Sequence, residues 1–341
     1  MDVPPRHSEL DDEIAVLIRS TTFEEATERI LAVWESYLPL KAELLGRRIR
    51  SLPDVLWEQE PVLLLALACV HRAAPVSNPH AALAYLDAAA GTLRDRPDLV
   101  VRIALERSKS QRGLGRLVDA RAQVLSARQS LSAAHLGVRM RLELEASTLF
   151  EEGACLALAG ELDWAARQIR HGIGLAGDRV VTGRVEALGW LAVIEYFLGR
   201  AGEPGVHLAA AETLGGREHG LELAPALLAE TLVALDEADT ERARAMLERL
   251  DGIAEGTEFA AFALQLRAML ETSGALEQLD LLQAVELATH DWQAAALIRS
   301  LHDGERAAVL TRFGSFGAAR DAVAGLPRKN PLHARHAHCP E

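Results

Sequence analysis

The stretch Gly115-Arg116-Leu117-Val118-Asp119-Ala120-Arg121 opens a pattern that this 341-residue chain repeats. In each copy a glycine is followed five residues later by a small residue and, four residues after that, by an apolar one. Glycine commonly ends a helix, and a small residue lets the next helix pack closely against it. We call this junction between two paired helices an elbow. Its recurrence along a sequence is typical of stacked helix pairs. The copies start at Gly115, Gly160, Gly199 and Gly314, and a weaker copy has Ala238 in the glycine place.

The small residue of the elbow gives the period of the array. Successive small residues lie about 40 residues apart, as in helical-repeat proteins. The last step spans about two such periods, and a degraded copy at residues 274–279 occupies the gap. The pattern predicts an all-α fold. Its spacing resembles that of the tetratricopeptide repeat, stretched from its usual length, and this resemblance implies a right-handed superhelix of tetratricopeptide-like antiparallel helix pairs. The positions concerned are Ala82, Ala120, Ala165, Pro204, Ala243 and Ala319.

Helix-start signals agree with this fold. Thr22 and Glu25 have the spacing of a capping box. Asn78 before Pro79 predicts an N-cap followed by a first-turn proline, and Asp239 has the chemistry to cap the helix that follows it. A sustained alternation of apolar and polar residues, which would indicate strands, is missing from the sequence.

The elbows divide the chain into three parts. Residues 1–40 are expected to form N-terminal helices that lead into the array, and residues 41–326 the tetratricopeptide-like repeats. Residues 327–341 form a His-rich segment, expected to be a flexible tail or linker. In its run His333-Ala334-Arg335-His336-Ala337-His338-Cys339, zinc or nickel binding is the alternative to a plain polar tail. No second ligand cluster accompanies this run, so we expect no metal site.

Composition and charge narrow the function classes. The formal net charge is −13 and the chain has few lysines, which argues against direct nucleic-acid binding because that depends on basic side chains meeting phosphates. Met1 to Arg19 lacks the apolar run of a secretory signal, and the apolar run from Pro61 to Val70 is too short to span a bilayer. A cytoplasmic protein that does not bind membranes is expected. Cys69 and Cys155 lie in apolar stretches and are expected to be buried free thiols.

A family resemblance accompanies the repeat pattern. Residues 44–70 include Ile49-Arg50-Ser51-Leu52-Pro53-Asp54-Val55-Leu56 and the apolar run Glu60-Pro61-Val62-Leu63-Leu64-Leu65-Ala66-Leu67-Ala68. They resemble the start of the helical-repeat region in MalT-like, LuxR-type transcriptional regulators of actinobacteria. Leu114-Gly115-Arg116-Leu117-Val118-Asp119-Ala120 resembles the elbows of these proteins, as does Leu198-Gly199-Arg200-Ala201-Gly202-Glu203-Pro204, with proline in the final place.

The resemblance implies a sensor or protein-interaction region of a bacterial transcriptional regulator. Such regulators also carry an ATP-binding module and a DNA-binding helix-turn-helix domain. This sequence contains no Gly-x-x-x-x-Gly-Lys-[Ser/Thr] phosphate loop, and it ends about where the DNA-binding domain would begin. The expected partner is therefore a protein, a peptide or a small effector, with self-association as a further alternative. The rival hypothesis is a stand-alone scaffold that mediates protein–protein interactions.

Enzymatic motifs are missing from the sequence. Gly-x-Ser-x-Gly and His-Glu-x-x-His do not occur. The adjacent acids Glu151 and Glu152 point apart on a helix and are expected to lie on solvated faces. We therefore expect neither a catalytic site nor a bound cofactor.

The first helix of each repeat is expected to line the concave surface, where repeat arrays bind their partners. Spacings of seven and three place Arg102, Lys109 and Arg112 on one side of such a helix, a candidate site for an anion or a carboxylate. Phe150 and Tyr196 would add an apolar part from the next two repeats. The alternative is that the charges are solvated and the aromatic rings only pack between repeats.

Two tryptophans, Trp164 and Trp190, are flanked by alanine and leucine at helical spacing. Both are expected in the core or between repeats.

Overall fold

The computed structural model describes residues 60–73, 77–93, 96–177, 183–200, 203–215 and 220–271, with positions 46, 49, 50, 297–299, 301, 303 and 321. Within these residues the chain is all-α, with eleven α-helices and one short 3₁₀ helix. They are α4 (Pro61–Ala73), α5 (Pro79–Thr92), α6 (Pro97–Gly113), α7 (Leu117–Ala133), α8 (Val138–Leu158), α9 (Leu162–Ala176), α10 (Arg184–Phe197), α11 (Glu203–Gly215), η2 (Gly220–Leu223), α12 (Ala224–Asp236), α13 (Thr240–Ala254) and α14 (Phe259–Glu271).

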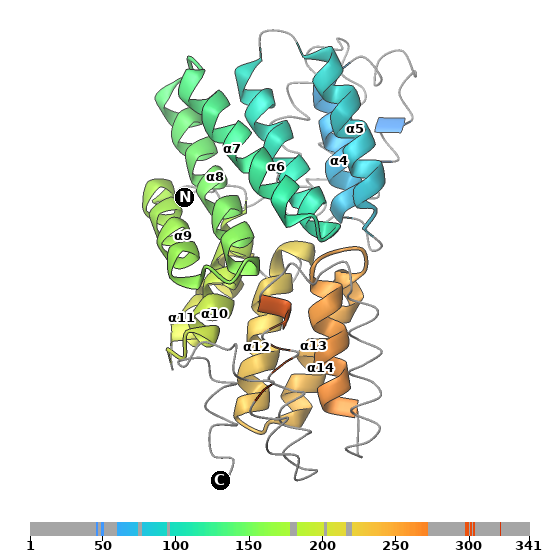
Figure 1. The fold of residues 1–341 in the computed structure, drawn as a ribbon, viewed down its shortest axis with the longest axis vertical. Helices are drawn as coiled ribbons and strands as arrows, with labels where there is room; N and C mark the ends of the chain where they lie inside the picture. The colour runs from blue at the N-terminus through green and yellow to red at the C-terminus, as the bar shows by residue number, and fades with distance from the viewer. Residues whose placement is uncertain are drawn as a thin grey trace.

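The helices pack as successive antiparallel pairs. Helix α4 packs on α5, α6 on α7, α8 on α9, α10 on α11 and α12 on α13. The first helices of successive pairs also contact one another, α6 with α8, α8 with α10 and α10 with α12. The first helices therefore form an inner row and the second helices an outer row (Figure 1). This arrangement confirms the predicted all-α helical-repeat fold.

Four elbows share one backbone geometry. Gly115, Gly160, Gly199 and Ala238 have positive φ angles of 73°, 80°, 67° and 59°. At each elbow the next residue donates its N–H to a carbonyl five positions earlier, as from Arg116 N to Gln111 O at 2.9 Å. This is the Schellman ending of a helix, which glycine favours because its backbone tolerates a positive φ. The sequence pattern predicts an elbow at each of these four positions.

Ala238 is the only non-glycine residue with a positive φ among the described residues. The left-handed conformation costs an L-residue about 1–2 kcal/mol, and glycine's extra chain entropy returns about 0.5–1 kcal/mol of that cost. We expect Ala238→Gly to raise the free energy of unfolding by about 0.5–1 kcal/mol. Urea unfolding would measure this change. The matched variant Ala122→Gly, at an exposed position inside α7, should instead lower stability by about 1 kcal/mol.

The predicted small residues lie at the contacts between paired helices. Ala82, Ala120, Ala165 and Ala243 are fully buried, and Pro204 is buried in the first turn of α11. A Cβ added to Gly153 of α8 would lie 3.3 Å from the carbonyl oxygen of Ala165 in α9. The backbones of this pair therefore approach closely, and only small side chains fit between them.

The predicted caps are confirmed where the structure describes them. The side chain of Asn78 accepts a hydrogen bond from Ala81 N at 3.0 Å, and that of Asp239 accepts one from Arg242 N at 3.1 Å. The capping box at residues 22–25, residues 1–40, the elbows after residue 271 and the tail 327–341 lie outside the described residues.

The array turns back on itself, so that the first repeat touches the fifth. In Figure 1, α12–α14 lie below α4–α6. Ser77, between α4 and α5, donates its N–H to the carbonyl of Glu255 at 3.2 Å. A Cβ on the neighbouring Gly256 would lie only 2.2 Å from Ser77 O. We call this contact the closure. It brings the α13–α14 loop against the C-terminal ends of α4 and α6.

The outer surface carries scattered apolar side chains. Trp190 is buried as expected, but Trp164 is 48% exposed. The prediction for Trp164 was wrong because this residue lies on the outer face of α9, where the guanidinium of Arg167 covers its ring at 4.9 Å.

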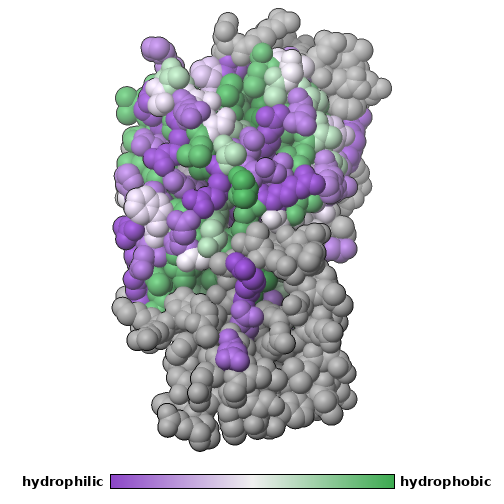
Figure 2. All heavy atoms as spheres, viewed as in Figure 1, coloured by the Kyte–Doolittle hydropathy of each residue, from purple (hydrophilic) through white to green (hydrophobic). Residues whose placement is uncertain are grey.

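Figure 2 shows hydrophilic and hydrophobic residues interspersed over the described part of one face. Among the described residues, no helix is both long enough and apolar enough to cross a bilayer.

Candidate functional site

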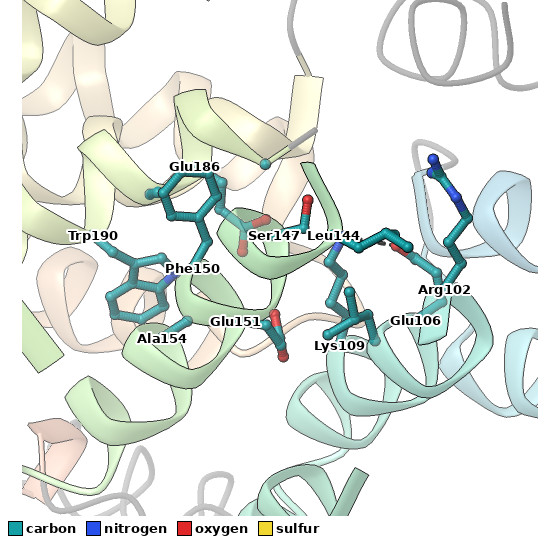
Figure 3. Close-up of a pocket in the computed structure, with 13 residues that line it drawn as sticks. Arg102, Glu106, Lys109, Leu144, Ser147, Phe150, Glu151, Ala154, Glu186 and Trp190 are labelled. Carbon is teal, nitrogen blue, oxygen red and sulfur yellow. Dashed lines mark hydrogen bonds and ion pairs between the residues drawn. The ribbon is translucent and has the colours of Figure 1, made fainter. Parts of the chain in front are cut away.

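A pocket opens on the inner row, between α6, α8 and α10. We call it the inner pocket. The space open to the centres of water molecules is about 40 Å³, room for a few waters. In Figure 3 its aromatic side chains, Phe150 and Trp190, lie at the opposite end from Arg102. Its charged and aromatic lining residues are Arg102, Glu106, Lys109, Phe150, Glu151, Glu186 and Trp190.

Helical spacing places these side chains. On α6, Arg102, Glu106 and Lys109 are four and three positions apart and therefore lie on one face. Glu186 stands in the first turn of α10, and Trp190 lies one turn later on the same helix. Three successive repeats thus contribute to one pocket.

Behind the pocket lies a buried charge cluster that joins four helices and the α13–α14 loop. Arg112 is its centre. Its guanidinium bonds Glu151 of α8 at 3.1 Å and Glu186 of α10 at 2.7 Å, and it also pairs with Glu258 beside the closure. Glu106 accepts from Arg72 of α4 at 3.0 Å and from Lys109 at 2.7 Å. Three cations and four carboxylates therefore meet at the inner side of the array.

The carboxylates of the cluster differ in the direction of their pKa shifts. Burial alone would raise the pKa of Glu106, but the adjacent Lys109 ammonium and Arg72 guanidinium outweigh burial and hold that pKa at about 2. Burial likewise opposes ionisation of Glu186, whose pKa is nevertheless lowered by Arg112 and Lys109. These two side chains are ionised at neutral pH.

Other carboxylates are less well compensated. Burial raises the pKa of Glu151 and of Glu258, and the negative charge of Glu186 adds to both shifts. Glu222 of η2 has a pKa of about 7, raised first by burial and then by Glu186. The cluster therefore contains more negative charge than Arg72, Lys109 and Arg112 balance.

Glu222 should make stability depend on pH. Because its folded pKa of about 7 exceeds the unfolded value of about 4.3, the folded state binds the extra proton and stability falls as pH rises through this window. We expect Glu222→Gln to stabilise the protein at pH 8 and to change little at pH 5. Urea unfolding at both pH values tests this expectation. An equal effect at the two values would show that the carboxylate does not titrate in this range.

The predicted partner-binding residues separate into three positions. Arg102, Lys109 and Phe150 line the inner pocket. Arg112 lies on the same side of α6 but is buried in the charge cluster, with 2% of its surface exposed. Tyr196 is buried away from the pocket, and its hydroxyl donates to Asp236 of α12 at 3.2 Å. Lys109 and Arg112 are neither solvated nor an isolated basic strip, because glutamates pair with both.

Sequence reasoning missed those glutamates. Glu151 and Glu152 do point apart, but Glu151 is buried in the cluster and only Glu152 lies on the outer side, where it pairs with Arg128 at 2.9 Å. The expectation that Glu151 is solvated was therefore wrong. The available signal was helical phase, since Glu151 lies three and four positions before Ala154 and Cys155, on an apolar side of the helix.

The described residues offer little for nucleophilic or metal chemistry. Cys155 lies 3.6 Å from Ser108 Oγ, but burial raises its pKa, so the thiol stays protonated. Cys69 is also buried and free, as expected. In the described part of the chain, no three His, Cys, Asp or Glu side chains are grouped to hold a metal ion.

No family model matches the sequence, and no curated protein matches it either.

Proposed function

We propose that this chain is a helical-repeat sensor or protein-interaction module that receives its partner or effector in the inner pocket. The observation that carries the proposal is the lining of this pocket. Arg102 and Lys109 of α6 meet Phe150 of α8 there, on the inner row, the surface through which helical arrays commonly bind. The expected ligand is a protein, a peptide or a small effector.

The resemblance to LuxR-type regulators supports a more specific form of this proposal. In that form the module senses a ligand and passes its state to a DNA-binding domain. The alternative is a scaffold that only organises protein partners. The reading frame on both sides of this segment separates the two, because a regulator carries a phosphate-loop module upstream and a helix-turn-helix domain downstream.

Site-specific photo-cross-linking tests the location of binding. A photoreactive residue at Ser147, which lines the inner pocket, should capture the partner from cells of the source organism. The same residue at Leu125, 57% exposed on the outer helix α7, is the matched control. Cross-links from Leu125 alone would mean that the outer row binds the partner.

The module itself is expected not to bind DNA. Its net charge of −13 opposes contact with phosphates. A gel-shift titration at low salt should therefore show no complex at micromolar protein. A sequence-specific shift would contradict the proposal that this segment only senses.

A further inference from the structure

We propose that the inner pocket binds a protonated amine carried on a small apolar body, the group that a free organic amine or a peptide N-terminus presents. This inference rests on the proposed function, because it names the chemistry that the inner face recognises.

The first support is the charge of the lining. Three carboxylates, those of Glu106, Glu151 and Glu186, line the pocket together with Arg102 and Lys109, and Arg72 and Arg112 pair with these carboxylates from behind the pocket. Both oxygens of Glu106 are already paired, with Lys109 and Arg72. Glu186 uses Oε1 to accept from Arg112 at 2.7 Å, and within the described residues its Oε2 accepts no hydrogen bond. An ammonium group has three donors and suits such an oxygen.

The second support is an unpaired donor. Trp190 lines the pocket and is 1% exposed, yet its Nε1–H has no hydrogen-bond partner among the described residues. The centroid of its ring lies 5.9 Å from the Arg112 guanidinium and 5.4 Å from the centroid of the Phe259 ring. Buried donors are normally paired. A ligand with an acceptor next to its amine, such as the carbonyl of an amino-acid amide, satisfies this donor.

The third support is the size and polarity of the remaining wall. Leu105, Leu144, Phe150 and Ala154 supply apolar surface beside the carboxylates. The space of about 40 Å³ fits only a short apolar body near the amine. A larger ligand would have to extend through the mouth of the pocket.

Protonation of the cluster agrees with this geometry. Glu222 has a pKa of about 7, raised by burial and by Glu186, while Lys109 and Arg72 oppose the shift and Glu106 adds to it. Burial also raises the pKa of Glu151 and Glu258. A bound cation should therefore release protons from the cluster. Calorimetry at pH 6.5 in buffers of different ionisation enthalpy would detect this release.

Three probes of nearly equal size test whether binding requires a positive charge. L-alaninamide carries an ammonium group, L-lactamide a hydroxyl in its place, and L-lactate a negative charge. We expect the full chain to bind L-alaninamide at least about tenfold more tightly than the other two, the ratio typical of one hydrogen-bonded ion pair. Isothermal titration calorimetry at pH 6.5 measures the three affinities. Binding of L-lactamide or L-lactate as tight as that of L-alaninamide would overturn the proposal, as would the absence of binding by all three.

Variants assign the contact to residues. Glu186→Gln should weaken L-alaninamide binding by about tenfold. The control Glu152→Gln, on the outer side of α8, should leave binding unchanged. Trp190→Phe removes the indole donor together with part of the ring, and it should weaken L-alaninamide and L-lactamide alike. An affinity for L-alaninamide that neither Glu186→Gln nor Trp190→Phe alters would place the ligand elsewhere and overturn the proposal.

A further experiment tests whether the amine belongs to a peptide N-terminus or to a free small molecule. Ala-Ala-Ala-amide binds if the pocket accepts a peptide N-terminus, and its N-acetylated form then does not. Binding of L-alaninamide alone identifies a free amine. If a partner cross-links at Ser147 but none of the amine probes binds, this inference fails while the proposed function stands.

Discussion

Replacing Arg112 by methionine is expected to lower the free energy of unfolding by about 3–5 kcal/mol at neutral pH. Methionine retains much of the length of the side chain but removes the charge. Glu151, Glu186 and Glu258 would then lose their shared guanidinium inside the array. Breaking a buried ion pair from one side leaves uncompensated charge, which costs more than the pair contributed.

The loss should depend on pH in a definite direction. Without Arg112 the three carboxylates would have folded pKa values above the unfolded value of about 4.3. The folded variant would then bind more protons than the unfolded chain, so its stability falls as pH rises. The difference from the wild type should be small near pH 5 and largest at pH 7 to 8. Urea unfolding at pH 5 and pH 7.5 measures it.

A surface arginine provides the control. Arg128 pairs with Glu152 at 2.9 Å, and its side chain is 50% exposed. Arg128→Met should cost no more than about 1 kcal/mol. If Arg112→Met costs as little, or if its cost is the same at both pH values, then the cluster does not hold the repeats together electrostatically.

Local features of the fold were predictable from the sequence because their causes are local. The elbows require a residue that tolerates a positive φ, and glycine marks three of the four described ones. Ala238 was identified only through the pattern that follows it, Ala243, Leu247 and Leu250. The caps Asn78 and Asp239 act on residues three positions away, so sequence alone could identify them.

The closure could not be predicted in the same way. A repeat pattern specifies how each helix pair contacts the next, but the small rotations between pairs accumulate along the array. Arg112 and Glu258 are 146 residues apart, and no periodic signal relates them. The contact of Ser77 with Glu255 likewise depends on the summed rotation of the intervening repeats.

The candidate site was half predictable for a similar reason. Helical phase correctly brought Arg102, Lys109 and Arg112 to one side of α6. Assigning Glu151 to solvent then hid its pairing with Arg112 across repeats, and no sequence signal marked Glu186 as a second partner. Tyr196 was assigned to the same surface by elbow register, but a neighbouring helix covers it.

Gly256→Ala is expected to be the most damaging glycine substitution at the closure. Gly256 has a φ of 73°, and its added Cβ would lie 2.2 Å from Ser77 O and 3.0 Å from Ser77 C. Strain of the left-handed backbone and overpacking against another segment's backbone together cost about 2–5 kcal/mol. The matched control is Gly183→Ala, with a left-handed φ of 80°, where the new Cβ meets only Phe150 Cδ2, at 4.0 Å, among the described residues. It carries only the backbone cost of about 1–2 kcal/mol.

The position of the damage tests the closure more directly than its size. In an open array each repeat contacts only its neighbours, so a change in the α13–α14 loop would leave α4 and α5 undisturbed. In the closed array Gly256 and Ser77 touch, so Gly256→Ala should speed amide hydrogen exchange in α4 and α5 as well as in α13. Helices α8 and α9, which lie between them in the chain, should keep their protection. Unchanged exchange in α4 and α5 would mean that the first and fifth repeats are not coupled, and the charge cluster would then have to form without the closure.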